Sequence, residues 1–383
     1  MDEPSLRRQP AARPDADGLQ PDAERPSAAQ PAEAGETGVR SGRAAGRRRA
    51  AAARGAGGAQ KTAPRRRELL TAVADLIGAG AAVYLLCSML LRLAAGGVLK
   101  LISPGATFED AAGVPEFVPG LLNLILAVAG LWLAVRFLKE LCPAQLRPAC
   151  AMTDPRDRRL WLFLPVFLGV SLLGDVLSAA LQRLLTAHTG YTAPAAVQLP
   201  DSGLALLLYF AAMCVAPAIL EELFCRGMMQ GMLRRWGVWF SIVVSSVVFT
   251  LLHADIAQMP SIFVLSVFLG LVAYATDSLM PGMVLHFVNN VAAFIFLLTQ
   301  QKLDGVKAFG MLTYLVGVMV LAAAVCVGVI HRLGLMRTLR PIPQVYDPKN
   351  RQKRVLRLAT APLFMAVMLW LAVRAVLPLF ARG

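Results

Sequence analysis

The stretch APAILEELFCRGMMQGMLRRWG, residues 216–237, places three charged side chains directly after a long apolar run. At 3.6 residues per turn, Glu222 and Arg226 share one helix face, with the carboxylate on the favourable N-terminal side of the guanidinium. Glu221 lies about 100° round the helix and has no partner at this spacing. The stretch therefore predicts an ion pair between Glu222 and Arg226, and an unpaired carboxylate at Glu221.

Two environments are open to these charges on local sequence alone. The helix either leaves the membrane at Leu220, so that all three groups are in water, or it carries them at membrane depth. A charged side chain at the bilayer centre costs on the order of 2.5–3.5 kcal/mol on insertion scales. Three such groups within two helical turns would then need a functional reason.

The composition shows that this is a membrane protein. The 383 residues are 57% hydrophobic and only 16% charged, and the mean hydropathy is +0.58. A soluble domain of this size carries less apolar and more charged sequence. A hydrocarbon core of about 30 Å needs roughly 20 apolar residues in a helix.

The apolar runs predict an all-α fold, a polytopic transmembrane helical bundle with eight or nine spans. Asp75 and Asp175 interrupt the first and the third run, and the sixth run is short. The predicted spans cover residues 69–95, 118–138, 160–185, 203–222, 238–256, 261–276, 282–299, 309–331 and 358–380.

The first 67 residues differ from the rest of the chain. They are rich in Ala, Pro, Gly and Arg, a composition that cannot bury enough apolar surface to fold, so we predict a disordered cytoplasmic tail at 1–67 and a membrane domain at 68–383. Between Arg40 and Arg67 there are ten basic residues and no acidic one. A basic segment beside a first span attracts anionic lipid, so we expect a lipid contact there and no nucleic-acid partner.

The charge of the loops predicts the orientation. Segments 147–159, 231–237 and 340–357 are basic, whereas 103–117 carries acidic residues only. With the N-terminus in the cytoplasm, nine spans put all three basic loops inside, as the positive-inside tendency requires. The formal net charge of +14 then reflects topology and the tail. We expect an integral protein of a bacterial plasma membrane.

Two histidines favour burial of the charges near Glu221. His253 ends an apolar run with Phe249 one turn before it, and His286 has Asn290 one turn after it. A lone histidine in an apolar helix is more often a packing residue than a catalyst. Two of them, each with an i,i+4 partner and both following a glutamate pair, indicate a polar site inside the bundle.

Helix geometry tests whether these groups can meet. If RRWGV (234–238) is a hairpin, Glu221 and His253 both lie about 21 Å from the turn, at matching depth. His286 comes out roughly 10 Å lower if the helices are straight. Closing that gap requires tilt, or a turn at 277–282 that lies inside the protein, where non-helical backbone is tolerated at membrane depth. We predict that Glu221, His253, His286 and Asn290 line one water-accessible cavity.

Three motifs in order resemble a known family. EELFCR (221–226) has Glu-Glu-x-x-x-Arg spacing, FTLLH (249–253) has Phe-x-x-x-His, and HFVNN (286–290) has His-x-x-x-Asn. Together they resemble the CPBP intramembrane proteases, which include the Rce1-type CAAX prenyl endopeptidases and the bacteriocin-processing or immunity (Abi-type) proteins. The resemblance covers about 200–300, and Cys225 stands where members often have Phe.

The resemblance implies a glutamate-dependent endopeptidase. Glu221 would be the general base that activates water, and His253 would hold the same water. His286 and Asn290 would donate to the tetrahedral oxyanion. Peptide hydrolysis requires such groups.

The resemblance also implies that Glu222 and Arg226 form a supporting pair. The family is often labelled a metalloprotease, and two histidines with a carboxylate are a plausible zinc set. There is no His-Glu-x-x-His helix in the chain, so we do not favour zinc and leave the cofactor open.

A second class of function uses the same polar cluster. A transporter, or an immunity or scaffold protein, would place ionisable groups in the membrane for an ion or a partner. The absence of clear repeated halves weakens the transporter interpretation. The substrate expected of an enzyme is a membrane-embedded or lipid-anchored peptide or protein.

Overall fold

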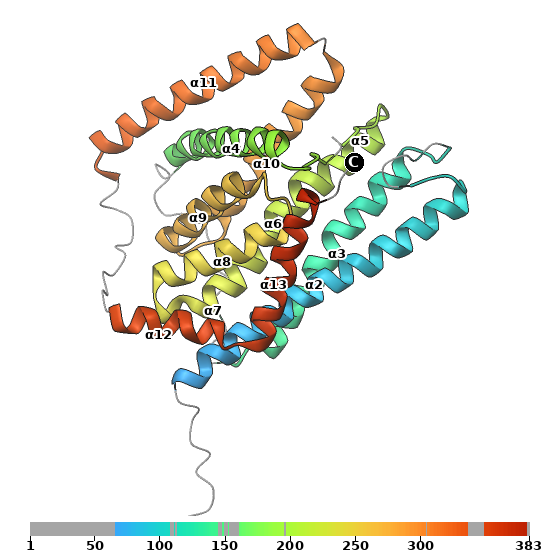
Figure 1. The fold of residues 1–383 in the computed structure, drawn as a ribbon. Coiled ribbons are helices and arrows are strands. Elements are labelled where there is room, and N and C mark those ends of the chain that lie inside the picture. The colour runs from blue at the N-terminus through green and yellow to red at the C-terminus, as the bar shows by residue number, and fades with distance from the viewer. Residues whose placement is uncertain are drawn as a thin grey trace, which may run out of the picture. The chain divides into compact units, whose positions relative to one another are not determined.

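A computed structural model gives the architecture, and every described element is helical (Figure 1). The structure describes residues 66–380, with gaps at 108–110, 112, 145–147, 149–151, 153–160, 195–196, 304 and 336–347. The predicted tail and its lipid contact therefore lie outside the described residues, apart from the last two tail positions, which begin the first helix.

The elements follow one another as α2 (Arg66–Ile102), α3 (Phe117–Leu141), α4 (Phe163–His188), α5 (Gly203–Phe210), η3 (Ala211–Val215), α6 (Ala216–Glu222), η4 (Leu223–Gln230), α7 (Gly231–Leu233), η5 (Arg234–Trp236), α8 (Val238–Leu252), α9 (Met259–Thr276), α10 (Met280–Lys302), α11 (Gly305–Arg332), α12 (Pro348–Ala359), α13 (Pro362–Val376) and η7 (Leu377–Leu379).

Eight described helical stretches are long and apolar enough to cross a membrane, which confirms the polytopic bundle. The predicted span at 238–256 is the exception. Helix α8 has 15 residues and ends at Leu252 rather than at 256. At 1.5 Å per residue it is about 22 Å long, short of a 30 Å core. The predicted span at 358–380 is present as Pro362–Leu379, and it starts a few residues later than predicted because α12 ends at Ala359 as a separate helix.

One long helical stretch, Gly203–Trp236, carries the charged sequence. It is not a regular α-helix, because the π-helical segments η3 and η4 flank α6 on both sides. Pro217 stands in the first turn of α6 and has no N–H to donate, so the turn before it loses a regular i→i−4 bond. π-Helical turns are frequent at functional sites. Both glutamates lie at the junction between α6 and η4.

The predicted hairpin at 234–238 is confirmed. The chain reverses at Gly237, whose φ of 127° favours glycine, and α8 starts at the next residue. Arg234 Nη1 lies 2.7 Å from Asp277 Oδ1, which ties this turn to the turn before α10. Arg354 of α12 also donates to the carbonyl of Trp236. The basic residues of the hairpin and of α12 thus gather at one end of the bundle.

Helices α2 and α13 lie side by side (Figure 1). Asp75 Oδ1 accepts the backbone N–H groups of Leu363 and Phe364, at 2.9 and 3.1 Å, and so satisfies two donors at the start of α13. Gly78 permits this approach, since a Cβ there would stand 2.7 Å from Phe364 Cα. The acid that interrupts the first apolar run is therefore a capping residue for the last helix.

The main apolar core joins α2, α3, η4, α8 and α13. Its fully buried members include Ile77, Leu138, Phe224, Phe249 and Leu371. Helices from both ends of the chain therefore enclose the segment that carries the charges, and residues far apart in sequence meet at the site.

Candidate active site

The predicted pair of Glu222 and Arg226 forms inside the bundle. Arg226 Nη1 lies 2.7 Å from Glu222 Oε1, and both side chains are buried. Arg226 Nη2 donates to the carbonyl oxygen and to the hydroxyl of Ser266 on α9, at 2.9 and 2.8 Å. The guanidinium also stacks over the ring of Phe249, 4.7 Å from its centroid. The charges are thus neutralised and hydrogen-bonded at depth, which rules out the interpretation that they are all in water.

His286 of α10 joins the same buried cluster. Its Nδ1 lies 3.0 Å from Glu222 Oε1, and its Nε2 lies 3.8 Å from Glu221 Oε2. An ionised carboxylate only accepts hydrogen bonds, so Nδ1 of His286 is the donor to Glu222. Gly282, one turn earlier on α10, permits the close approach, because a Cβ there would stand 3.2 Å from Glu222 Oε2. His286 therefore contacts both glutamates from the buried side.

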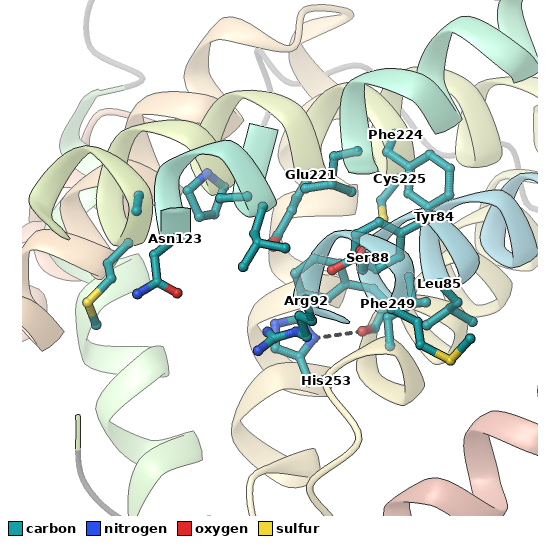
Figure 2. Close-up of a pocket in the computed structure, with 18 of the residues that line it drawn as sticks. Tyr84, Leu85, Ser88, Arg92, Asn123, Glu221, Phe224, Cys225, Phe249 and His253 are labelled. Atoms are coloured by element: carbon teal, nitrogen blue, oxygen red, sulfur yellow. Dashed lines mark hydrogen bonds between the residues drawn. The ribbon is translucent and has the colours of Figure 1, made fainter. Parts of the chain in front are cut away.

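Glu221 has different surroundings from its neighbour. Its side chain is 19% exposed, against 0% for Glu222, and it lines a cavity of ≈ 630 Å³. Figure 2 shows Glu221, Asn123, Ser88 and His253 arranged around one space. The carboxylate that the sequence leaves unpaired is thus the one that faces the cavity.

His253 lies at the end of α8 and lines the same cavity. Its Nδ1 lies 2.9 Å from the carbonyl oxygen of Phe249 (Figure 2). A carbonyl only accepts, so Nδ1 carries a hydrogen and donates. In the neutral ring this leaves Nε2 as an acceptor. The predicted convergence of Glu221 and His253 on one cavity is confirmed.

The same prediction is wrong for His286 and Asn290. Among the described residues that line the cavity, neither is present. His286 is turned into the buried cluster by its bond to Glu222. Asn290 is half-buried on α10, and its side chain makes no hydrogen bond within the described part of the chain.

The turn before α10 lies beside the basic hairpin. Ser278 and Leu279 are buried, but Asp277 has a positive φ of 50°, is exposed and pairs with Arg234 of the hairpin. The expected turn inside the protein is therefore not what the structure has. His286 nevertheless reaches Glu222 six residues after Met280, so the straight-helix estimate placed it too far from the glutamates.

The segment after α8 is held by a second polar group. The hydroxyl of Tyr191 donates to Asp255 Oδ1 at 2.9 Å, and Asp255 also accepts from the N–H of Ala257 and from Gln258. Burial, together with the bond to the Asp255 carboxylate, raises the pKa of Tyr191 to about 12. Since Asp255 follows His253 by two residues, this group fixes the backbone next to the histidine.

Sequence reasoning missed the other wall of the cavity. Its polar side chains from outside residues 200–300 are Tyr84, Ser88 and Arg92 of α2, Asn123 of α3 and Arg374 of α13. The signal available in the sequence was a basic residue inside an apolar run, at both Arg92 and Arg374.

The residues present do not make a metal centre. Within the described ranges, no three His, Cys, Asp or Glu side chains gather as a metal-ligand set. His286 Nδ1 is used by Glu222, and only Glu221 and His253 of the expected zinc set face the cavity.

The comparisons with known proteins agree with the motifs. Residues 203–292 match the family described as Type II CAAX prenyl endopeptidase Rce1-like. This segment contains all six predicted site residues, and the match supports the resemblance to CPBP and Rce1-type proteins. It does not extend to the Abi-type subgroup. No curated protein and no solved structure matches the chain.

Proposed function

Because residues 203–292 form an Rce1-like membrane segment, we propose that this integral membrane protein is an intramembrane endopeptidase acting on membrane-associated peptides. The observation that carries the proposal is the contrast between the two glutamates. Glu222 is fully buried and paired, whereas Glu221 faces a cavity that His253 also lines. A general base needs such access to water and substrate.

In the proposed reaction, Glu221 accepts a proton from a water molecule held between its carboxylate and Nε2 of His253. The water oxygen bonds to the carbonyl carbon of the peptide and forms a tetrahedral oxyanion. The C–N bond then breaks, and Glu221 returns the proton to the leaving amine. Atoms and charge balance without any further reactant.

His286 supports this base from the buried side. Its bond to Glu222 fixes the ring, and Nε2 then stands 3.8 Å from Glu221 Oε2. The arrangement favours a positioning role for His286. An oxyanion site at His286 and Asn290, as the family resemblance implies, has less support because neither residue lines the cavity.

The cavity indicates how a substrate approaches. Val197, in the segment between α4 and α5, belongs to its wall, whereas the basic hairpin and α12 lie at the other end of the bundle. With the basic end and the N-terminus in the cytoplasm of a bacterial cell, the cavity opens towards the outer face. The membrane domain from residue 68 onwards then contains the whole site, and tail 1–67 is dispensable for hydrolysis.

The competing proposal is a non-enzymatic protein that uses the cluster for an ion or a partner. The Rce1-like match does not favour it. The enzyme proposal requires Glu221 to act as a base. A transporter requires instead an ionisable group whose charge changes during transport.

The test compares membranes that contain the wild type with membranes that contain Glu221→Gln at equal abundance. New peptide termini in membrane proteins are measured by mass spectrometry. The proposal predicts termini that appear only with the wild type. If the two sets of termini coincide, the proposed hydrolysis is wrong.

A further inference from the structure

The proposed hydrolysis still needs a hydrogen-bond donor for the oxyanion on the cavity wall. His286 and Asn290, the donors that the family resemblance implies, do not line the cavity. His253 does line it, but its Nδ1 donates to the carbonyl of Phe249, which leaves Nε2 as an acceptor in the neutral ring. A tetrahedral oxyanion in an apolar cavity is stabilised by donors aimed at the oxygen. The donor must therefore come from another residue of the wall.

Tyr84 of α2 presents a hydroxyl to this cavity. Tyr84 and Glu221 both line it, and the phenol interacts electrostatically with the Glu221 carboxylate. Figure 2 shows Tyr84 on one side of Glu221 and Asn123 on the other. The ring of Tyr84 also packs against that of Phe224, with 6.4 Å between the centroids. Phe224 follows Glu221 by three residues on the same helical stretch, so the hydroxyl is a neighbour of the proposed base.

Packing holds the ring of Tyr84, and a hydrogen bond holds its hydroxyl. Gly130 of α3 lies against the ring edge, since a Cβ there would stand 3.3 Å from Tyr84 Cδ2 and 2.8 Å from Ser88 Oγ. Ser88, one turn further along α2, is hydrogen-bonded to the Tyr84 hydroxyl. When Ser88 donates, the phenolic oxygen accepts, and the phenolic proton stays available for a third group. A donor held in this way needs little reorganisation when charge develops on a substrate.

The second tyrosine of the wall has a different partner. The hydroxyl of Tyr209 is hydrogen-bonded to the side chain of Asn123, so these two polar groups satisfy each other. Among the charged groups around Tyr84, by contrast, Glu221 acts on it most strongly. Tyr84 is therefore the tyrosine placed to meet a carbonyl group that the water at Glu221 attacks.

We propose that Tyr84 is a catalytic residue that donates a hydrogen bond to the tetrahedral oxyanion. The water activated by Glu221 adds to the carbonyl carbon, and the carbonyl oxygen, as it becomes negative, accepts the phenolic O–H. The proton stays on the Tyr84 oxygen throughout, so no bond to Tyr84 forms or breaks. The interaction strengthens in the transition state because the accepting oxygen gains charge. This inference rests on the proposed function, since it assigns a donor for the same hydrolysis, and it places that donor outside the Rce1-like segment.

The first test compares Tyr84→Phe with the wild type, both as full-length protein in the same detergent. The probe is a lipid-anchored, quenched fluorescent peptide that contains a cleavage site mapped through its dependence on Glu221. Loss of one oxyanion donor should lower kcat by about 100-fold or more. KM and the unfolding temperature should stay at their wild-type values, because phenylalanine keeps the ring between Gly130 and Phe224.

Two further variants bracket this result. Ser88→Ala leaves the phenol in place but removes the bond that orients it, and should lower kcat by about tenfold, the worth of one hydrogen bond. Tyr314→Phe is the matched control, because Tyr314 is an exposed tyrosine of α11 that does not line the cavity. Its kcat should equal that of the wild type. If Tyr84→Phe fails to fold, Ser88→Ala decides, and a normal kcat in that variant overturns the inference.

A binding measurement separates donation to the oxyanion from a structural role. In the Glu221→Gln background, the same peptide is offered with its scissile amide intact, or with that amide replaced by a phosphinate whose charged oxygen mimics the oxyanion. Adding Tyr84→Phe should weaken phosphinate binding at least about tenfold, because a hydrogen bond to a charged group is lost. Binding of the amide peptide should not change. A structural defect would weaken both ligands equally and would overturn the inference.

A normal kcat in folded Tyr84→Phe would also overturn the inference, and so would a rise in KM alone. A large loss of kcat in Asn123→Ala, with normal cleavage by Tyr84→Phe, would place the donor on the other wall. Failure of the proposed function appears at an earlier step. No cleavage site would then depend on Glu221, and the role of Tyr84 would fall with the hydrolysis itself.

Discussion

The buried cluster around Glu222 and the cavity wall around Glu221 begin one residue apart on α6, yet their surroundings are opposite. In the cluster, Glu222, Arg226 and His286 are buried and hydrogen-bonded to one another. On the wall, the carboxylate of Glu221 is exposed to a cavity. One residue turns a helix by about 100°. That rotation separates a glutamate that is buried and paired from a glutamate that faces the cavity.

The largest loss of stability is expected when the cation of the buried cluster is removed. Arg226→Ala leaves Glu222 without its counter-charge and removes two hydrogen bonds to Ser266. Breaking a buried pair from one side costs about 3–5 kcal/mol. We expect this loss in the free energy of unfolding, measured by thermal or denaturant unfolding in detergent.

The matched control is Arg136→Ala. Arg136 also pairs with a glutamate four residues away, but its side chain and that of Glu140 are 51% and 61% exposed. An exposed pair contributes at most about 1 kcal/mol. Equal losses in the two variants would mean that the pair at Arg226 is not buried as described.

A smaller effect is expected at His286, which joins the two regions. His286→Ala removes one of the two donors to Glu222 Oε1 and leaves Arg226 in place. Loss of a buried hydrogen bond to a charged group costs about 1–3 kcal/mol. The same unfolding assay should give a value between those of Arg136→Ala and Arg226→Ala. If His286→Ala unfolds with the same free energy as wild type, the hydrogen bond between His286 and Glu222 does not stabilise the fold as described.

The smallest effect concerns the segment next to His253. The pKa of Tyr191 is raised from 10.0 to about 12 in the folded protein, so the stability it contributes is present below pH 10 and is lost as the pH rises towards 12. Tyr191→Phe removes the bond to Asp255 and should cost about 1 kcal/mol at pH 8. The difference between wild type and variant should shrink between pH 10 and pH 12. A difference that stays constant over this range would contradict the pairing of Tyr191 with Asp255.

Local helix geometry was sufficient to predict part of the site. The spacing of Glu222 and Arg226, the hairpin at 234–238, and the matching depth of Glu221 and His253 all depend on helical phase and rise, which the sequence supplies directly. Three motifs in order added the family resemblance.

The remaining features depend on contacts that spacing does not encode. The estimate for His286 assumes straight, regular helices, whereas π-helical segments flank α6 on both sides. The wall from α2 and α13 is formed by residues more than a hundred positions from Glu221. Asp75 and Asp175 were seen as interruptions of spans, but they bond the start of α13 and Ser261 of α9.

The division of labour between the two glutamates is tested most directly by comparing Glu221→Gln with Glu222→Gln, each scored for peptide cleavage and for thermal unfolding in the same detergent. Glu221→Gln should lower cleavage by at least about 100-fold, because a general base is lost, and should leave stability within about 0.5 kcal/mol of wild type. Glu222→Gln should lose about 3–5 kcal/mol of stability, since Arg226 keeps its charge without a partner. Near-normal cleavage by a folded Glu221→Gln protein would contradict the account, as would an unchanged stability of Glu222→Gln.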